Sequence, residues 1–129
     1  MKSFRFNDNF KIIFPDDWKL EKDNEVISLF EPEKGVGALQ FSSYSPPHDI
    51  DLIKVDKELE DFLKDKYGVV EVKLANNYSY FSITDEDNLF WRYWLFKGQK
   101  AMMFISYNCE ADDKGKEDKI VDEIIKSAL

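Results

Sequence analysis

The chain has 129 residues, a length that favours one domain over two. It is 43% hydrophobic and 34% charged, with 5 glycines and 4 prolines, so it is neither collagen-like nor wholly disordered. The 26 acidic and 18 basic residues give a net charge of -8. Phosphate backbones and anionic lipids repel such a surface, so we expect neither nucleic acid nor a membrane as the main partner.

The cysteine content and the N-terminal segment both favour a cytoplasmic protein. Cys109 is the single cysteine, so no disulfide can form within the chain, as is usual in a reducing compartment. The segment Met1–Asp8 becomes polar too early for a signal peptide, and no run of about 20 apolar residues predicts a membrane-spanning helix.

Short β-prone segments separated by turn residues fill the first part of the chain. They are Phe10–Phe14, Trp18–Glu21, Val26–Glu31 and Gly37–Tyr44. In the last segment, Leu39 and Phe41 share one face, whereas Gln40, Ser42 and Tyr44 share the other.

A helix is expected next, beginning at Asp49 or Asp51, because a carboxylate there can cap free N–H groups and interacts favourably with the helix dipole. Its apolar positions recur at helical spacing: Leu52, Val55, Leu59, Phe62, Leu63 and Tyr67. Gly68 is placed to end the helix.

The remaining sequence predicts a second group of strands and a closing helix. The strands are Val69–Ala75, Tyr78–Thr84, Leu89–Lys97 and Lys100–Asn108, with turns short enough for an antiparallel meander. The helix runs from Gly115 or Lys116 to Ala128, and its apolar stripe is Ile120, Val121, Ile124, Ile125 and Ala128.

The segment Leu89–Phe96 has large apolar side chains on both faces, which is typical of a central strand covered on both sides. The sequence therefore predicts one α+β domain over residues 1–129. We expect an antiparallel sheet of about six to eight strands, flanked by two amphipathic helices.

Three phrases of the sequence resemble the PsbP-like superfamily. The segment Phe14–Trp18 resembles its opening aromatic–proline–tryptophan phrase, and Gly37–Tyr44 resembles a G-x-L-x-I-S-x-Y strand of its small bacterial members. A third resemblance, to the closing strand and helix of the superfamily with their I-I-x-S-L ending, lies in Ile105–Tyr107 and Ile124–Leu129. Phe41 replaces the isoleucine of the strand pattern, and Ala128 is inserted into the ending.

The resemblance implies an antiparallel sheet sandwiched by helices and a binding function without catalytic residues. The better-known members are an extrinsic subunit of photosystem II and a Ran-binding nuclear import factor. The small bacterial cytosolic members resemble this chain more closely, and some of those are candidate immunity proteins of toxin systems.

The sequence contains no set of residues typical of a catalytic or metal site. One histidine and one cysteine cannot build the usual zinc site, and the acidic turns Asp85–Asp87 and Asp112–Asp113 lack the spacing of a calcium loop. His48 follows two prolines in a loop, and we interpret it as a surface residue. We expect no catalytic residue, no metal and no cofactor.

Aromatic residues make up 16% of the chain, which is more than a core of this size needs. They either fill the layers between sheet and helices or form a binding patch of the residue types enriched at hot spots. The candidate binding residues are Arg92, Trp91, Trp94, Tyr44, Gln40 and Ser42.

Two functions are consistent with these observations. The first is a non-catalytic protein-binding domain, whose sharper form is an immunity-type protein that neutralises a basic toxin or effector. The alternative is a small-molecule-binding protein or minor enzyme with an aromatic-lined cleft. The sequence leaves open whether the chain is a monomer or a weak dimer.

Overall fold

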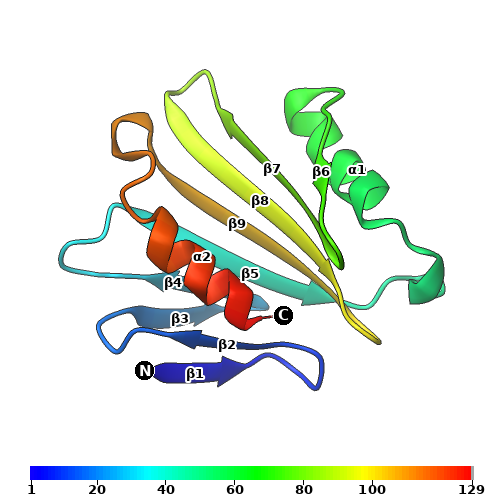
Figure 1. Cartoon of the computed structure of the whole chain (residues 1–129), viewed down its shortest axis with the longest axis horizontal. Coiled ribbons are helices and arrows are strands. Elements are labelled where there is room, and N and C mark those ends of the chain that lie inside the picture. Colours follow the sequence, from blue (N-terminus) through cyan, green and yellow to red (C-terminus); the bar gives the residue numbers. More distant parts are fainter. Residues whose placement is uncertain (129) are drawn as a thin grey trace.

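Seven strands form one antiparallel sheet in the computed structural model, which describes residues 1–128 (Figure 1). They are β3 (Lys19–Asp23), β4 (Val26–Phe30), β5 (Gly37–Tyr44), β6 (Lys73–Leu74), β7 (Tyr78–Thr84), β8 (Leu89–Lys97) and β9 (Met102–Glu110). Their order across the sheet is β3-β4-β5-β9-β8-β7-β6, so the longest strands, β8 and β9, pair near its middle.

One face of the sheet, which we call the α2 face, is covered by a hairpin and a helix. The hairpin consists of β1 (Lys2–Arg5) and β2 (Lys11–Phe14), and the helix α2 (Asp118–Ser127) lies against β2. The Oγ of Ser127 accepts a hydrogen bond from the N–H of Ile13 at 2.8 Å, which joins helix to hairpin. Both elements bury apolar side chains in one cluster with the sheet: Phe10, Ile12, Phe14, Leu39, Phe41, Trp94, Ile105, Val121, Ile124 and Ile125.

The opposite face, which we call the α1 face, is covered in part by the helix α1 (Val55–Tyr67). This helix packs against β6, β7 and β8. Its buried residues Leu59 and Leu63 share a second core cluster with Tyr93, Leu95 and Met102 of the sheet. The two helices therefore lie on opposite faces of an α+β fold, as the sequence predicts.

The prediction of a central, two-sided strand is confirmed in β8. Phe90, Trp94 and Phe96 are buried on the α2 face, whereas Tyr93 and Leu95 are buried on the α1 face. The strand is fifth of seven in the sheet.

The predicted start of the first helix was wrong. Residues Ile50–Leu52 form a short 3-10 turn, capped by the carboxylate of Asp49, and α1 begins only at Val55. The ammonium group of Lys97 donates hydrogen bonds to the carbonyls of Asp51 and Ile53, and these contacts fix the extended segment between turn and helix.

Further elements differ from the prediction, among them β9, which runs over Met102–Glu110 where Lys100–Asn108 is expected. Only Lys73–Leu74 of the expected strand Val69–Ala75 pairs in the sheet, because Val70 and Val72 pack beneath α1 instead. The polar strand β1 was not predicted, since its pairing with β2 depends on the packing of the hairpin over the sheet. A 3-10 turn and Gly115, at φ +90, delay the start of α2 to Asp118.

Neither helix of the described chain is both long and apolar enough to cross a lipid bilayer.

We predict that Trp94→Ala lowers the free energy of unfolding by about 3–5 kcal/mol, because the ring is 4% exposed in the larger core cluster. Urea denaturation checks this value. Leu52→Ala is the control, since Leu52 is 77% exposed and its truncation is expected to change stability by less than about 0.5 kcal/mol. A loss below about 1 kcal/mol for Trp94→Ala would contradict the position of the ring in the core.

Candidate functional site

The six candidate binding residues lie on two opposite faces of the sheet. Side chains alternate along β8, so Arg92 and Trp94 project from the α2 face and Trp91 from the α1 face. On β5, the residues Gln40, Ser42 and Tyr44 also project from the α1 face. The structure therefore does not bring the six residues into one patch.

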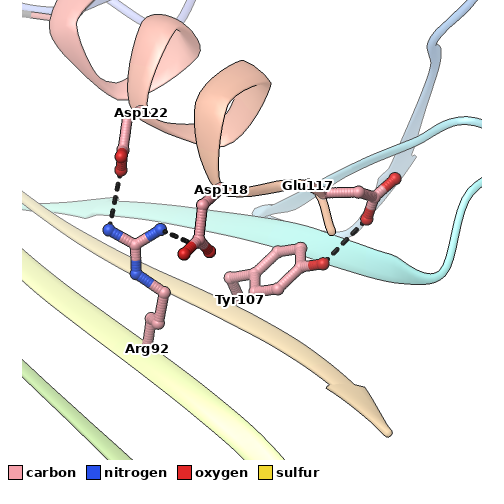
Figure 2. A network of polar contacts seen from close by, with 5 residues as sticks. All are labelled: Arg92, Tyr107, Glu117, Asp118 and Asp122. Atoms are coloured by element: carbon pink, nitrogen blue, oxygen red, sulfur yellow. Dashed lines mark hydrogen bonds and ion pairs between the residues drawn. The ribbon is translucent and has the colours of Figure 1, made fainter. Parts of the chain in front are cut away.

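Arg92 joins the sheet to α2 (Figure 2). Its Nη2 lies 2.7 Å from Oδ1 of Asp122, and its Nη1 lies 3.4 Å from Oδ1 of Asp118, one helical turn away. The guanidinium also lies over the ring of Trp94, 4.6 Å from the centroid. These contacts occupy Arg92 within the fold, and Trp94 is buried beneath it.

A second polar contact holds the start of the same helix. The hydroxyl of Tyr107 donates a hydrogen bond to Oε1 of Glu117 at 2.7 Å (Figure 2). Burial and this carboxylate raise the pKa of Tyr107 above its ordinary value. Burial also raises the pKa of the Cys109 thiol in the same part of the core, so the thiol stays protonated and unreactive. These contacts on the α2 face stabilise the fold.

Trp91 is the inner member of a polar and aromatic cluster near the end of α1. Its indole N–H donates to Oδ2 of Asp85 at 2.9 Å. Lys66 lies 4.0 Å from the centroid of one of its rings, and the ring of Tyr93 stacks against it at 5.7 Å. Trp91 is half-buried, and its side chain is held in place by three neighbours.

The carboxyl of Asp85 has a pKa below its ordinary range. The main cause is the hydrogen bond from the N–H of Leu89, followed by the indole of Trp91, the N–H of Asp87 and the nearby Lys66. The ionised carboxylate therefore fixes both the turn before β8 and the position of Trp91.

A row of five aromatic rings crosses the α1 face. Successive centroids lie 5.7 Å apart for Trp91 and Tyr93, 6.0 Å for Tyr93 and Phe104, 5.2 Å for Phe104 and Phe62, and 5.8 Å for Phe62 and Tyr44. Phe62 comes from α1 and is 44% exposed, whereas the other four rings come from the sheet. We call this series the aromatic row.

Beyond the aromatic row, the α1 face continues over β9, β5, β4 and β3 without a helix packed on it in the described chain. We call this area the uncovered surface. Its central side chains are polar and neighbour one another across the paired strands: Ser28, Gln40, Ser42, Ser106 and Asn108. Gln40 is exposed, Ser28, Ser42 and Asn108 are half-buried, and Ser106 is buried between its neighbours.

Carboxylates surround the uncovered surface. Glu21 and Asp23 of β3 and Glu110 of β9 share this face by strand alternation. On α1, Glu58 and Asp65 stand four residues before and three residues after Phe62, so they occupy the same flank of the helix.

The ammonium groups of Lys19, Lys66 and Lys97 lie on this face, and each has a partner among the described residues. Lys19 lies 3.3 Å from Glu21, and Lys66 lies over Trp91. Lys97 donates to the carbonyls of Asp51 and Ile53. The uncovered surface is therefore a neutral polar floor with an acidic border.

The hydroxyl of Tyr44 is buried and has no hydrogen-bond partner among the described residues. Burial, with a smaller contribution from Glu58, raises the pKa of Tyr44 above its ordinary value. The ring closes one end of the aromatic row, and its hydroxyl contributes no internal bond.

A separate cleft of about 850 Å³ lies at the end of the sheet where several loops meet. Its polar lining includes Asp8, Asp56, Asn76, Asn77 and Gln99. None of the six candidate residues lines it. The sequence contains one hint of this cleft, since the turns at Asn76–Asn77 and Gly98–Gln99 fall at the same end of an antiparallel meander.

No protein-family model and no curated protein sequence matches the chain. A crystal structure from Bacteroides thetaiotaomicron VPI-5482, determined at 1.50 Å resolution, is similar with a TM-score of 0.62 and 18% sequence identity. The similarity covers 93% of this chain and 44% of that chain, so this chain spans less than half the length of its neighbour. At such low identity the likeness shows a shared fold and nothing about function.

We predict that Tyr44→Phe leaves the free energy of unfolding unchanged or raises it by up to about 1 kcal/mol, because the substitution removes a buried hydroxyl without a partner. Tyr93→Phe is the matched control. It removes a hydrogen bond of 2.6 Å to the hydroxyl of Tyr67 and is expected to cost about 1 kcal/mol. Urea denaturation measures the free energy of unfolding of both variants. A larger loss for Tyr44→Phe than for Tyr93→Phe would contradict the prediction.

We also predict that Asp85→Asn destabilises the protein more at neutral than at acidic pH. The pKa of the folded carboxyl lies below its unfolded value, so its contribution is present above about pH 4 and is lost as the pH falls through the folded pKa. Urea denaturation at about pH 7 and about pH 3 measures the difference. Glu86→Gln in the same turn controls for the loss of a surface charge. An equal effect of Asp85→Asn on stability at both pH values would contradict the lowered pKa of Asp85 in the folded protein.

Proposed function

We propose that the chain is a non-catalytic protein-binding domain whose site is the uncovered surface together with the aromatic row. The observation that carries the proposal is a polar floor spread across three strands, β4, β5 and β9, with an acidic border and no helix packed on it beyond the aromatic row. Hydroxyl and amide side chains can form the hydrogen bonds of a polar interface, and the half-exposed Phe62 supplies an aromatic anchor beside them.

The acidic border favours a partner with a basic surface. Glu21, Asp23, Glu58, Asp65 and Glu110 all lie around the site, and the net charge of the whole chain is -8. Opposite charges speed the encounter of two proteins and align them before close contact. A sharper form of the proposal is an immunity-type protein that blocks a basic toxin or effector.

The resemblance to the PsbP-like superfamily supports a binding function, since its better-known members are binders, and we propose this assignment together with the function. The second candidate is a small-molecule-binding protein. The specific observation in its favour is the cleft of about 850 Å³ at the end of the sheet, which falls within the usual size of ligand pockets.

Matched substitutions separate the two candidates. Gln40→Arg places a cation and a larger side chain on the uncovered surface, and Gln99→Arg makes the same change at the lining of the cleft. Affinity capture from the native host lysate with the wild type supplies the partner, which is then titrated against the purified variants.

We expect Gln40→Arg to weaken binding of that partner by about tenfold or more, whereas Gln99→Arg binds as the wild type does. We also expect the association rate to fall as NaCl rises from about 50 to about 500 mM, because salt screens the acidic border. Unchanged binding by Gln40→Arg, or an association rate indifferent to salt, would contradict the proposal. Lost binding with Gln99→Arg alone would favour the cleft.

A further inference from the structure

The outer edge of β7 is only partly paired. β7 has seven residues, whereas its neighbour β6 has two. The register pairs Lys73 with Tyr80 and Leu74 with Ser79, and the rest of β7 toward Thr84 has no strand beside it in the described chain.

The direction of each backbone group along β7 follows from the neighbouring hydrogen bonds. The N–H of Asp85 donates to the carbonyl of Leu89, so the odd-numbered residues of β7 bond toward β8. The carbonyl of Tyr78 accepts from the N–H of Ala75, so the even-numbered residues bond toward β6.

Ser82 and Thr84 therefore present their N–H and C=O groups outward past the end of β6. Within residues 1–128, these groups have no backbone partner on that side. Both residues are exposed, and a hollow beside Ile83 and Thr84 leaves open space at this end of β7.

The two edges of the main sheet differ in their protection. The edge strand β3 carries charge at Lys19, Glu21, Lys22 and Asp23, and charged side chains discourage the addition of further strands. The segment Tyr80–Thr84 of β7 carries no charge and consists of residues favourable in strands, apart from Ser82. This open edge lacks the usual defence against strand addition.

We propose that the open edge of β7 accepts one short extended segment of a partner protein, in line with β6, and that this segment is basic. Strand addition of this kind uses backbone hydrogen bonds for affinity and side-chain contacts for specificity. Ser82 and Thr84 supply two donors and two acceptors for the incoming backbone. The strands covered by α1 separate this edge from the uncovered surface. The two sites are therefore distinct, and the inference goes beyond the proposed function.

The surroundings of the edge support a basic segment. A hollow of about 440 Å³ beside Ile83 and Thr84 can receive the side chains of an added strand. The turn Asp85–Asp87 borders it, and Lys66 and Tyr67 of α1 line it as well. The ammonium of Lys66 lies over the ring of Trp91. Glu86 and Asp87 are exposed and make no ion pair among the described residues. A second copy of this chain would bring a further net charge of -8 toward the same turn, which disfavours self-association here.

The first test is a titration of the isotopically labelled full chain with an alternating lysine–valine hexapeptide, followed by amide NMR and hydrogen exchange. We expect shifted resonances and slowed exchange at Ser82 and Thr84. The matched control peptide has proline in place of valine, which keeps the charge and prevents strand pairing. Protection elsewhere in the chain, or an equal response to the proline peptide, would overturn the proposal.

The second test uses the direction of the backbone groups. Ser82→Pro removes an outward N–H and leaves the bonds to β8, so the variant is expected to fold and to bind the hexapeptide about tenfold more weakly. Ile83→Pro removes an N–H that bonds to β8 and is expected to lower the Tm clearly more than Ser82→Pro does. Undiminished peptide binding by a folded Ser82→Pro variant would overturn the proposal.

If Ser82→Pro does not fold, the exchange measurement on the wild type decides by itself. Protection of Ser82 and Thr84 that rises with protein concentration in the absence of peptide would show that a second copy fills the edge, and would overturn the assignment of a partner protein.

Discussion

The whole structure depends on the need to cover both faces of the two central strands. β8 and β9 carry large apolar side chains on each face, so each face needs a packed layer. The hairpin and α2 together provide that layer on the α2 face. On the other face the only helix in the described chain is α1, and a helix about 10 Å wide covers roughly two strands spaced about 4.8 Å apart.

The side chains that the strands place on the α1 face match this unequal coverage. On the α1 face, apolar and aromatic residues occupy β7, β8 and the beginning of β9, where α1 packs. The same face becomes polar farther along β9, at Ser106 and Asn108, and stays polar at Gln40 and Ser42 of β5. The aromatic row lies along the transition between the two areas. A surface of this kind can remain in water without a further layer of the same chain, and it is also free for a partner.

Adjacent residues of β8 therefore have unrelated roles. Arg92 interacts with two carboxylates of α2 and with Trp94, and it keeps that helix on the sheet. Trp91 projects from the other face and is held by Asp85, Lys66 and Tyr93 at the start of the aromatic row. The uncovered surface and the open edge of β7 have a related origin, since α1 and the short β6 each cover only part of the strands beside them.

Local sequence patterns are sufficient to assign residues to the faces of the strands and helices. Alternation along a strand is a local property, so it correctly separated Leu39 and Phe41 from Gln40 and Ser42, and it correctly identified β8 as a strand with two buried faces. Helical spacing likewise identified the buried stripe of α2. These patterns were enough for the α+β class and for the antiparallel meander.

The layer that covers each face depends on long-range packing. The pairing of β1 with β2, the shortening of β6, and the late start of α1 at Val55 all depend on contacts between distant segments, such as those of Lys97 with the loop before the helix. The same holds for the candidate residues: Arg92 has its carboxylate partners 26 and 30 residues away in the chain. Their separation into a structural group and a surface group follows from long-range packing, which local patterns do not encode.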